Sequence, residues 1–170
     1  MARPQISTAG NEPGPALKKS PAKRASTKRR KSSAGRLRLL FSERVPSRIS
    51  AIEPVVERLL KGLETSGWVD GQRSAIELAI REALANAVFH GNGSDERKRV
   101  ALDCFEQGDG SVLLVVRDQG RGFDPASIAD PTHPENVCRA GGRGIFLIHH
   151  FMDAVEFDRG GREIRMRKCK

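Results

Sequence analysis

The residues that could do chemistry first appear as a row on one predicted helix. Glu82, Asn86 and His90 follow one another at intervals of four residues. Residues four apart stack along one side of a helix, so a carboxylate, an amide and an imidazole would share that side. Alanines at positions 79 and 83 flank the row and leave room for a bulky group against it. The row therefore indicates a ligand site rather than a packing surface.

The segment that must position this row has the pattern of an amphipathic helix. Ile80, Leu84, Ala87 and Val88 share an apolar side at about 100° per residue. That side would pack on the rest of the domain and hold the polar row on the other side. We expect Gly91 to end the helix as its C′ residue.

The remaining pattern predicts a second amphipathic helix and five strands. The helix carries apolar residues from Ile52 to Leu63 and begins with capping-box spacing from Ser50 to Glu53. Apolar residues predict strands near 37–41, 100–105, 111–117, 155–157 and 164–166. In the last strand, Glu163 is expected to face solvent. These elements predict an α+β fold, a two-layer α/β sandwich with one wet sheet face and one face covered by helices.

Two parts of the chain differ in charge. Residues 1–36 hold ten Lys and Arg against one acid, a net charge of +9, whereas residues 37–170 hold twenty of each sign, a net charge of zero. With few large apolar residues, residues 1–36 are predicted to be a disordered basic tail. The tail is either an electrostatic contact to nucleic acid or another polyanion, or a solubilising extension.

Cysteine usage and hydropathy bear on the compartment. Cys104, Cys138 and Cys169 are odd in number, far apart and without a C-x-x-C spacing. They argue for a reducing cytoplasm and against a disulfide framework or a zinc site. No apolar run follows the basic residues as in a secretory signal, and no stretch approaches the length of a membrane span. We therefore expect a cytoplasmic protein without membrane contact.

Two glycine-rich segments interrupt the regular pattern. DQGRGFDP follows the predicted central strand and contains Asp118, Gly120 and Gly122, whereas AGGRG at 140–144 opens a helix. Glycine lets a backbone approach a ligand closely, and a helix N-terminus favours phosphate. A carboxylate at a strand end can accept a hydrogen bond from an amino group such as that of adenine. The proline-containing segment 125–139 is predicted to be either disordered or a lid.

In combination and order these motifs resemble the nucleotide site of the GHKL (histidine-kinase-like) ATPase superfamily. The phrases EALANAVFHGN, DQGRGFDP and GGRGIFLIHHFMDAVEF are most similar to those of the bacterial anti-sigma-factor serine kinases. The resemblance implies the Bergerat ATPase fold, with a mixed, mostly antiparallel sheet covered on one face by helices. It also implies an ATP-binding kinase domain at residues 37–170 that uses Mg²⁺.

The same resemblance implies roles for the polar residues. Glu82 would be the general base that draws a proton from a serine hydroxyl or water, and Asn86 would bind Mg²⁺. His90 would either lie near the nucleotide or be an ordinary core or surface histidine, and Asp118 would select adenine. Arg162 stands where the family often has threonine. Gly120 and Gly122 would let the backbone pass close to the nucleotide. Gly142 and Gly144 would cradle the phosphates, with Arg143 or Arg139 adding positive charge.

Three functions are compared. The leading hypothesis is an ATP-dependent serine/threonine kinase that phosphorylates an anti-sigma-factor antagonist in a partner-switching pathway, binds a sigma factor and, as the resemblance suggests, forms a homodimer. The second is a nucleotide-gated module that sequesters a sigma factor or another regulatory protein without significant kinase activity. The third, a detached ATP domain of a sensor histidine kinase, ranks lower because the tail lacks the length and apolar heptads of a dimerisation helix.

Overall fold

A computed structural model describes residues 37–68, 70–124 and 142–170. The elements in chain order are β1 (Arg38–Pro46), the 3₁₀ turn η1 (Ile49–Ala51), α1 (Ile52–Thr65), α2 (Asp70–Asn86), the π-helical turn η2 (Ala87–Gly91), β2 (Arg99–Glu106), β3 (Val112–Arg117), α3 (Gly142–Phe151), β4 (Ala154–Asp158) and β5 (Glu163–Lys168). The strands form one sheet in the order β1-β2-β3-β5-β4, and each neighbouring pair is antiparallel. The predicted α+β class is confirmed.

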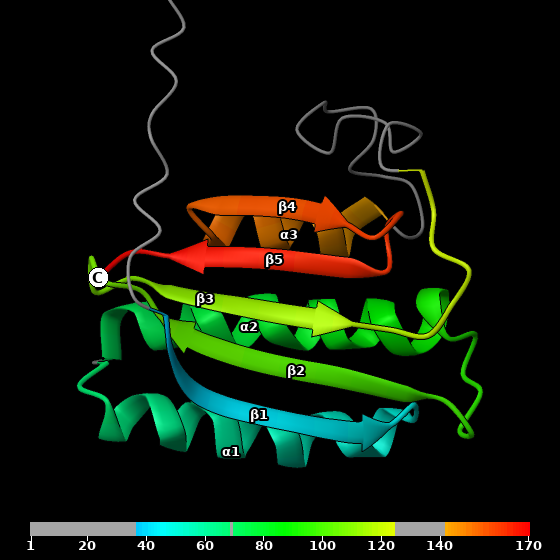
Figure 1. Cartoon of the computed structure of the whole chain (residues 1–170), viewed down its shortest axis with the longest axis horizontal. Helices are drawn as coiled ribbons and strands as arrows, with labels where there is room; N and C mark the ends of the chain where they lie inside the picture. The colour runs from blue at the N-terminus through cyan, green and yellow to red at the C-terminus, as the bar shows by residue number, and fades with distance from the viewer. Residues whose placement is uncertain (1–36, 69, 125–141) are drawn as a thin grey trace, which may run out of the picture. The chain divides into compact units, whose positions relative to one another are not determined.

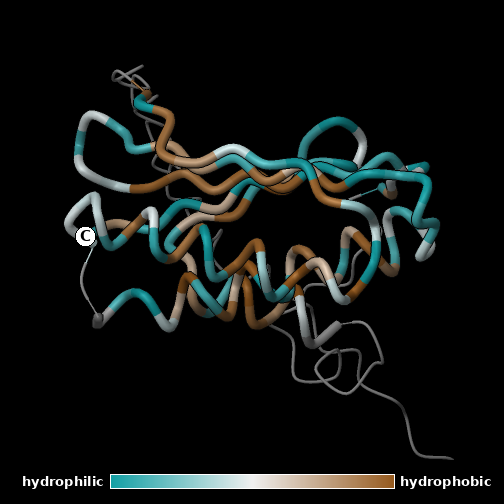
Figure 2. Tube along the Cα trace, turned by 90° about the horizontal axis from the view of Figure 1, so that it is seen from below, coloured by the Kyte–Doolittle hydropathy of each residue, from teal (hydrophilic) through white to brown (hydrophobic). Residues whose placement is uncertain are grey.

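The three helices lie on one face of the sheet, and the other face is open (Figure 1). Seen edge-on, hydrophobic residues of the helices and of the strands meet between the two layers (Figure 2). Helix α1 contributes six buried apolar residues at helical spacing, and β3 is the middle strand, as predicted. The largest wholly buried side chains include Leu59, Ile80, Leu84, Leu114 and Met166. Burial of these apolar surfaces holds the two layers together.

The start of α1 differs from the sequence-based expectation. Ser50 lies within the 3₁₀ turn η1, and the residue at the N-cap position of α1 is Ala51, which makes no side-chain capping bond. The predicted capping box from Ser50 to Glu53 is therefore wrong, because η1 feeds directly into α1. The end of α1 is conventional, since Gly67 follows Ser66 with a φ of 78°.

The end of α2 also differs from the expectation. The helix widens into the π turn η2, in which the N–H of Asn92 donates to the carbonyl of Ala87 at 2.8 Å. The residues with positive φ are Gly93 and Ser94, so Gly91 is not the predicted C′ residue. Single π turns inside helices occur often at functional sites. Here the turn brings Gly91 against the loop that follows β3.

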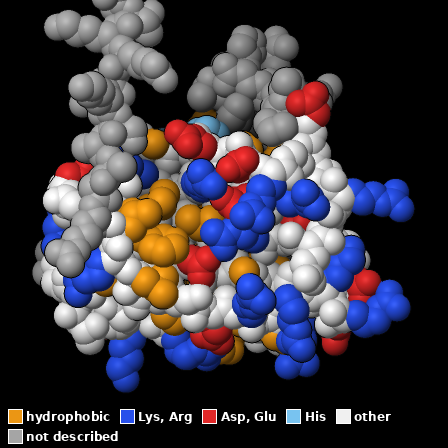
Figure 3. Space-filling view, in the orientation of Figure 1, with side chains coloured by type: hydrophobic (Ala, Val, Ile, Leu, Met, Phe, Trp, Pro, Cys, Tyr) orange, Lys and Arg blue, Asp and Glu red, His pale blue; other side chains and the backbone are white. Residues whose placement is uncertain are grey.

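On the open face of the sheet, Glu163 is buried rather than exposed to solvent. Its side chain is covered by Arg117, Arg159 and Arg165, and the nitrogen–oxygen distances are 2.6, 3.0 and 2.6 Å. Burial alone would raise the pKa of Glu163, but the arginine hydrogen bonds and charges outweigh it and lower this pKa. Figure 3 shows the Lys and Arg side chains of this face gathered beside a hydrophobic patch.

Several sequence-based expectations fall on residues outside the described ranges. They are the basic tail at 1–36, the segment 125–139, Arg139 and Cys138. Cys104 and Cys169 are free thiols, and burial raises the pKa of Cys104 to about 12. Across 37–68, 70–124 and 142–170, no helix combines the length and apolarity that crossing a membrane requires.

Candidate functional site

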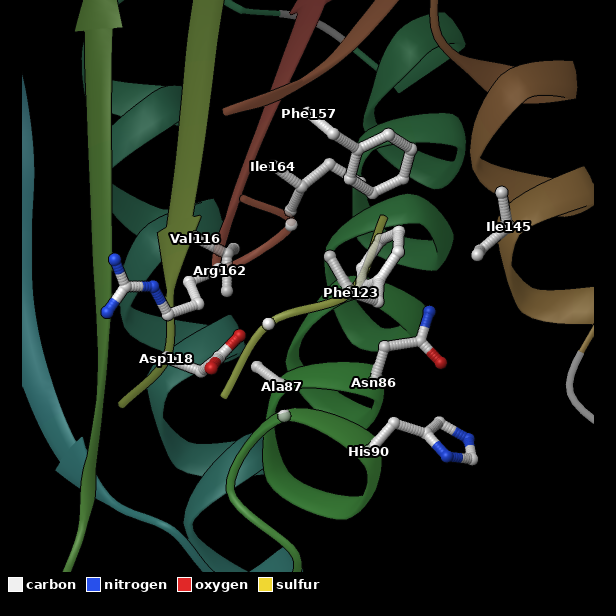
Figure 4. A pocket seen from close by; sticks show the side chains of 14 residues that line it. Asn86, Ala87, His90, Val116, Asp118, Phe123, Ile145, Phe157, Arg162 and Ile164 are labelled. Atoms are coloured by element: carbon white, nitrogen blue, oxygen red, sulfur yellow. The ribbon is translucent and has the colours of Figure 1, made fainter. Parts of the chain in front are cut away.

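A cavity of about 400 Å³ opens between α2, α3 and the loops at one end of the sheet. Figure 4 shows Asp118 at one end of this cavity and Asn86 and His90 nearer the other. The lining residues are Ala83, Asn86, Ala87, His90, Gly91, Val116, Asp118, Gly122, Phe123, Ile145, Phe157, Gly161, Arg162 and Ile164. Such a volume, mostly apolar with a few polar groups, is typical of a small-molecule site.

Asp118 is held rigidly at the end of β3. Its N–H donates to the carbonyl of Arg162 at 3.0 Å, and its Oδ1 accepts the N–H of Gly120 at 2.7 Å. Burial raises the pKa of the Asp118 carboxyl, opposed by that Gly120 N–H and by the charges of Arg162 and Lys98. A partly desolvated carboxylate of this kind is suited to accept a hydrogen bond from an amino group in the cavity.

The loop after β3 packs tightly on the end of α2 through glycines. A Cβ on Gly91 would lie 2.4 Å from Cγ of Asp118, and a Cβ on Gly120 would lie 1.9 Å from the carbonyl oxygen of Gly91. Real Cβ atoms do not approach this closely, so glycine is required at both positions. Gly91 is therefore a site residue, although the sequence suggested only a helix end.

Asn92 is a second structural residue that the sequence reasoning missed. Its amide is buried, accepts the N–H of Gln119 at 2.8 Å and donates to the carbonyl of Arg99 at 3.1 Å. Asn92 thus ties the end of α2 to β2 and to the Asp118 loop. In the sequence, Asn92 is the last residue of the phrase EALANAVFHGN and a second amide six residues after Asn86, but neither signal showed a structural role.

Aromatic side chains form another wall of the cavity that the sequence did not reveal. The rings of Phe123 and Phe157 meet edge to face, with centroids 5.3 Å apart. The N–H of Phe123 donates to the carbonyl of Gly160 at 3.0 Å, and Gly122 reaches this path with a φ of 76°. The loop after β3 and the β4–β5 turn are therefore joined, and together they offer an apolar surface for a flat ring.

Asn86 and His90 both line the cavity, as their spacing predicted. His90 is exposed. Ala83 also lines the cavity, whereas Ala79 is buried in the core, so only one of the two flanking alanines leaves room for a ligand.

Glu82 lies beside the cavity rather than among its lining residues. Its carboxylate faces the first turn of α3, where a Cβ on Gly144 would come within 2.7 Å of Oε2. Gly142 and Arg143 begin α3. Of the nine predicted site residues, four line the cavity, namely Asn86, His90, Asp118 and Gly122. Gly120 packs against Gly91, and Gly144 lies against Glu82. The side chain of Arg143 lies outside what is described.

Arg162 departs from the resembled family, which often has threonine at this position. It lines the cavity, and Figure 4 shows its guanidinium directed away from the cavity, past Asp118. Its Nε donates to the carbonyl of Arg159 at 3.0 Å. Arg162 therefore contributes its aliphatic stem to the wall and its positive charge to the surroundings of Asp118.

The described part of the site offers few ligand atoms to a metal ion. Among the described residues, no group of three or more His, Cys, Asp or Glu side chains could hold a metal ion. Asn86 offers one amide oxygen to the cavity. A single amide suits Mg²⁺ that takes its other ligands from phosphate and water.

Comparison with known proteins gives one family match and several relatives. Residues 45–168 match the family described as histidine kinase-like ATPase domain. The serine-protein kinase RsbW of Staphylococcus epidermidis is 35% identical over 85 residues, which cover 46% of this chain and 54% of that protein. The anti-sigma F factor of Oceanobacillus iheyensis is 29% identical over 83 residues, 48% of this chain and 56% of that protein. RsbW of Staphylococcus aureus (strain Newman) is 31% identical over 99 residues, 54% and 62% respectively.

These comparisons agree with the superfamily resemblance drawn from the motifs. The chain spans a little more than half the length of these relatives. The family match is the broader finding, since it covers β2, β3, β4, β5 and all three helices, together with the end of β1.

Proposed function

Because this chain belongs to the histidine kinase-like ATPase domain family, we propose that its cavity binds ATP and that the chain is a protein serine/threonine kinase. The observation that carries the proposal is that the carboxylate of Asp118 and the amide of Asn86 lie at different places along the cavity. Asp118 lies at one end and Asn86 toward the other, and Phe123 and Phe157 are among the residues that line the space.

Adenine fits the Asp118 end by its donors and its shape. Its exocyclic amino group would donate to the carboxylate of Asp118, and its flat ring would lie against the apolar wall that includes Phe123 and Phe157. Val116 and Ile164 exclude water from the same end, because both are buried. Oδ1 of Asp118 already accepts the N–H of Gly120, so the amino group would donate to the other carboxylate oxygen.

The phosphates would extend toward Asn86 and the first turn of α3. There the amide oxygen of Asn86 would bind Mg²⁺, which neutralises phosphate charge when bound. The backbone N–H groups of Gly142 and Gly144 would face the phosphate oxygens, with the positive end of the α3 dipole behind them. His90, at the cavity rim, would add a donor on the same side. We also propose that Arg143 adds positive charge.

Glu82 would accept the proton of the attacking hydroxyl. As the serine oxygen of the substrate forms its bond to the γ-phosphorus, the bond from that phosphorus to the ADP oxygen breaks, and the hydroxyl proton passes to the carboxylate. Positioning and charge neutralisation supply most of the catalysis in such transfers, so few side chains are needed.

The partners that we propose follow from the relatives. Two of them are named serine-protein kinase and one anti-sigma F factor. We propose that this chain phosphorylates an antagonist protein and binds a sigma factor as a homodimer. A second candidate is a nucleotide-gated binding module with little kinase activity, which is favoured by the place of Glu82 outside the cavity lining.

Titration and transfer with matched variants separate these two functions. Wild type, Glu82→Ala and Asn86→Ala are titrated with Mg-ATP, then incubated with Mg-ATP and a serine-containing antagonist protein. The kinase requires that Glu82→Ala binds Mg-ATP but transfers no phosphate and that Asn86→Ala loses Mg-ATP binding. Transfer at the wild-type rate by Glu82→Ala contradicts the role of this base, and binding without transfer by wild type supports the binding module.

A further inference from the structure

The first turn of α3 lies against the two polar residues of α2 that we propose as base and metal ligand. On Gly144, a Cβ would lie 2.7 Å from Oε2 of Glu82 but 3.4 and 3.5 Å from the side-chain nitrogen and oxygen of Asn86. The first distance is too short for any real contact, whereas the other two are ordinary van der Waals separations. A side chain at position 144 would therefore collide with Glu82 but not with Asn86.

We infer that Gly144 is a positioning residue for Glu82, in addition to any backbone contact that it makes with phosphate. Without a side chain at position 144, α3 can approach α2 closely enough to fix the carboxylate. The inference rests on the proposed function for its catalytic meaning, but the contact itself is independent of it.

A methyl group at position 144 should move the carboxylate without unfolding the domain. Gly144 has no positive φ, so alanine can adopt its backbone conformation. The atom in the way is the end of a flexible side chain, which can rotate aside. To regain an ordinary contact, Oε2 of Glu82 must shift by at least about 0.5 Å, which is the positional tolerance of catalytic groups.

The shift predicts a loss of rate with little loss of binding. Displacements of about 1 Å reduce catalysis about a hundredfold, so Gly144→Ala should lower kcat by about tenfold to a hundredfold. The dissociation constant for Mg-ATP should stay within about threefold, because Asn86 keeps its place and alanine retains the backbone N–H.

The chain offers a matched control in another helix. Gly62 lies in α1, and a Cβ there would meet nothing within 4 Å. Gly62→Ala should leave both kcat and nucleotide binding unchanged. Both variants should retain the wild-type fold, because alanine is favoured over glycine inside a helix. The buried Trp68 reports folding by fluorescence.

A double-variant cycle tests whether the effect passes through Glu82. Glu82→Asp withdraws the carboxylate by one methylene from position 144. In that background, adding Gly144→Ala should change kcat by less than about twofold. An equal loss in both backgrounds would overturn the inference, as would wild-type kcat in Gly144→Ala.

A readout without catalysis separates this inference from the proposed function. The ¹³C chemical shift of the Glu82 carboxyl, measured at one neutral pH, should change in Gly144→Ala and stay unchanged in Gly62→Ala. If wild type transfers no phosphate, the kinase proposal fails while this shift still supports the contact. An unshifted signal in Gly144→Ala overturns the inference whatever the activity.

Discussion

The exchange of Asp118 for asparagine tests the base-binding end of the cavity most directly. The variant keeps the shape of the side chain, and its Oδ1 can still accept the N–H of Gly120, which lies 2.7 Å away in the wild type. The second oxygen becomes an NH₂ group, which would meet the amino group of adenine donor to donor. We therefore expect Asp118→Asn to bind ADP more weakly.

The magnitude follows from the charge and the partial burial of this carboxylate. A hydrogen bond to a charged group contributes about 1.5 to 3 kcal/mol, which corresponds to a factor of about 10 to 150 in the dissociation constant. IDP carries a carbonyl oxygen in place of the amino group. The new NH₂ group can donate to that oxygen, so the same substitution should strengthen IDP binding and reverse the preference.

Isothermal titration of both proteins with ADP and IDP measures this effect. Asp109→Asn is the matched control, because Asp109 lies in the turn before β3, at the other end of the strand from Asp118, and pairs with Arg167 at 2.5 Å. It should leave both affinities unchanged. If Asp118→Asn weakened ADP and IDP equally, the carboxylate would not read the amino group and the orientation of the base would be wrong.

The pH dependence of binding gives an independent check of Asp118. Burial raises the pKa of this carboxyl above that of an ordinary aspartate, so it takes up its proton at a higher pH than the exposed carboxyls do. The protonated form no longer offers the same acceptor. ADP affinity should therefore fall as pH decreases through this raised pKa, and Asp118→Asn should lack that decline.

Three further predictions concern the scaffold and the tail. Gly91→Ala should destabilise the fold by about 1 to 3 kcal/mol and abolish ADP binding, because its Cβ would lie 2.4 Å from Cγ of Asp118. Urea unfolding followed by tryptophan fluorescence measures the loss of stability, with Gly62→Ala as the control. Wild-type stability in Gly91→Ala would contradict the close contact. Glu163→Gln should cost about 1 to 3 kcal/mol at neutral pH. Because the folded-state pKa of Glu163 is lowered, the stabilisation that its charge gives is complete above the ordinary glutamate pKa and is lost as pH falls through the lowered value. If the free energy of unfolding varied with pH in the same way in wild type and Glu163→Gln, this role of Glu163 would be wrong. The full chain should bind DNA with an affinity that falls steeply as the salt concentration rises, and a chain that begins at Leu37 should lose this binding. Equal DNA binding by the two chains would contradict a role for the basic tail.

The sequence predicts the parts of the site that depend on short-range spacing. The interval from Glu82 to Asn86 and the glycines around Asp118 are local patterns, and α1 and the hairpins follow from periodicity in the same way. The prediction that Gly91 ends the helix was wrong, because a glycine after apolar residues is compatible with a π turn as well as with an α-helical C-cap. Gly91 is fixed by contact with a loop 27 residues later, which no local pattern reports.

The aromatic wall and the buried Glu163 could not be predicted for a related reason. Phe123 and Phe157 are 34 residues apart and meet only because β3 pairs with β5. Glu163 alternates with inward-facing residues and so looks exposed. Its burial depends on three arginines from β3, β5 and the turn before β5, whose convergence is a property of the sheet.

The strand order sets when the cavity can form during synthesis. The middle strand β3 has β2 on one side, which precedes it, and β5 on the other, which is made last. Asp118 is anchored to the carbonyl of Arg162, so its final geometry waits for the C-terminal hairpin. The ribosome therefore synthesises the loop that contains Asp118 before it synthesises the hairpin of β4 and β5 that holds this loop. A nascent chain that ends before β5 would expose the edge of β3, and we expect it to bind no nucleotide, so that nucleotide binding would report docking of the hairpin formed by β4 and β5.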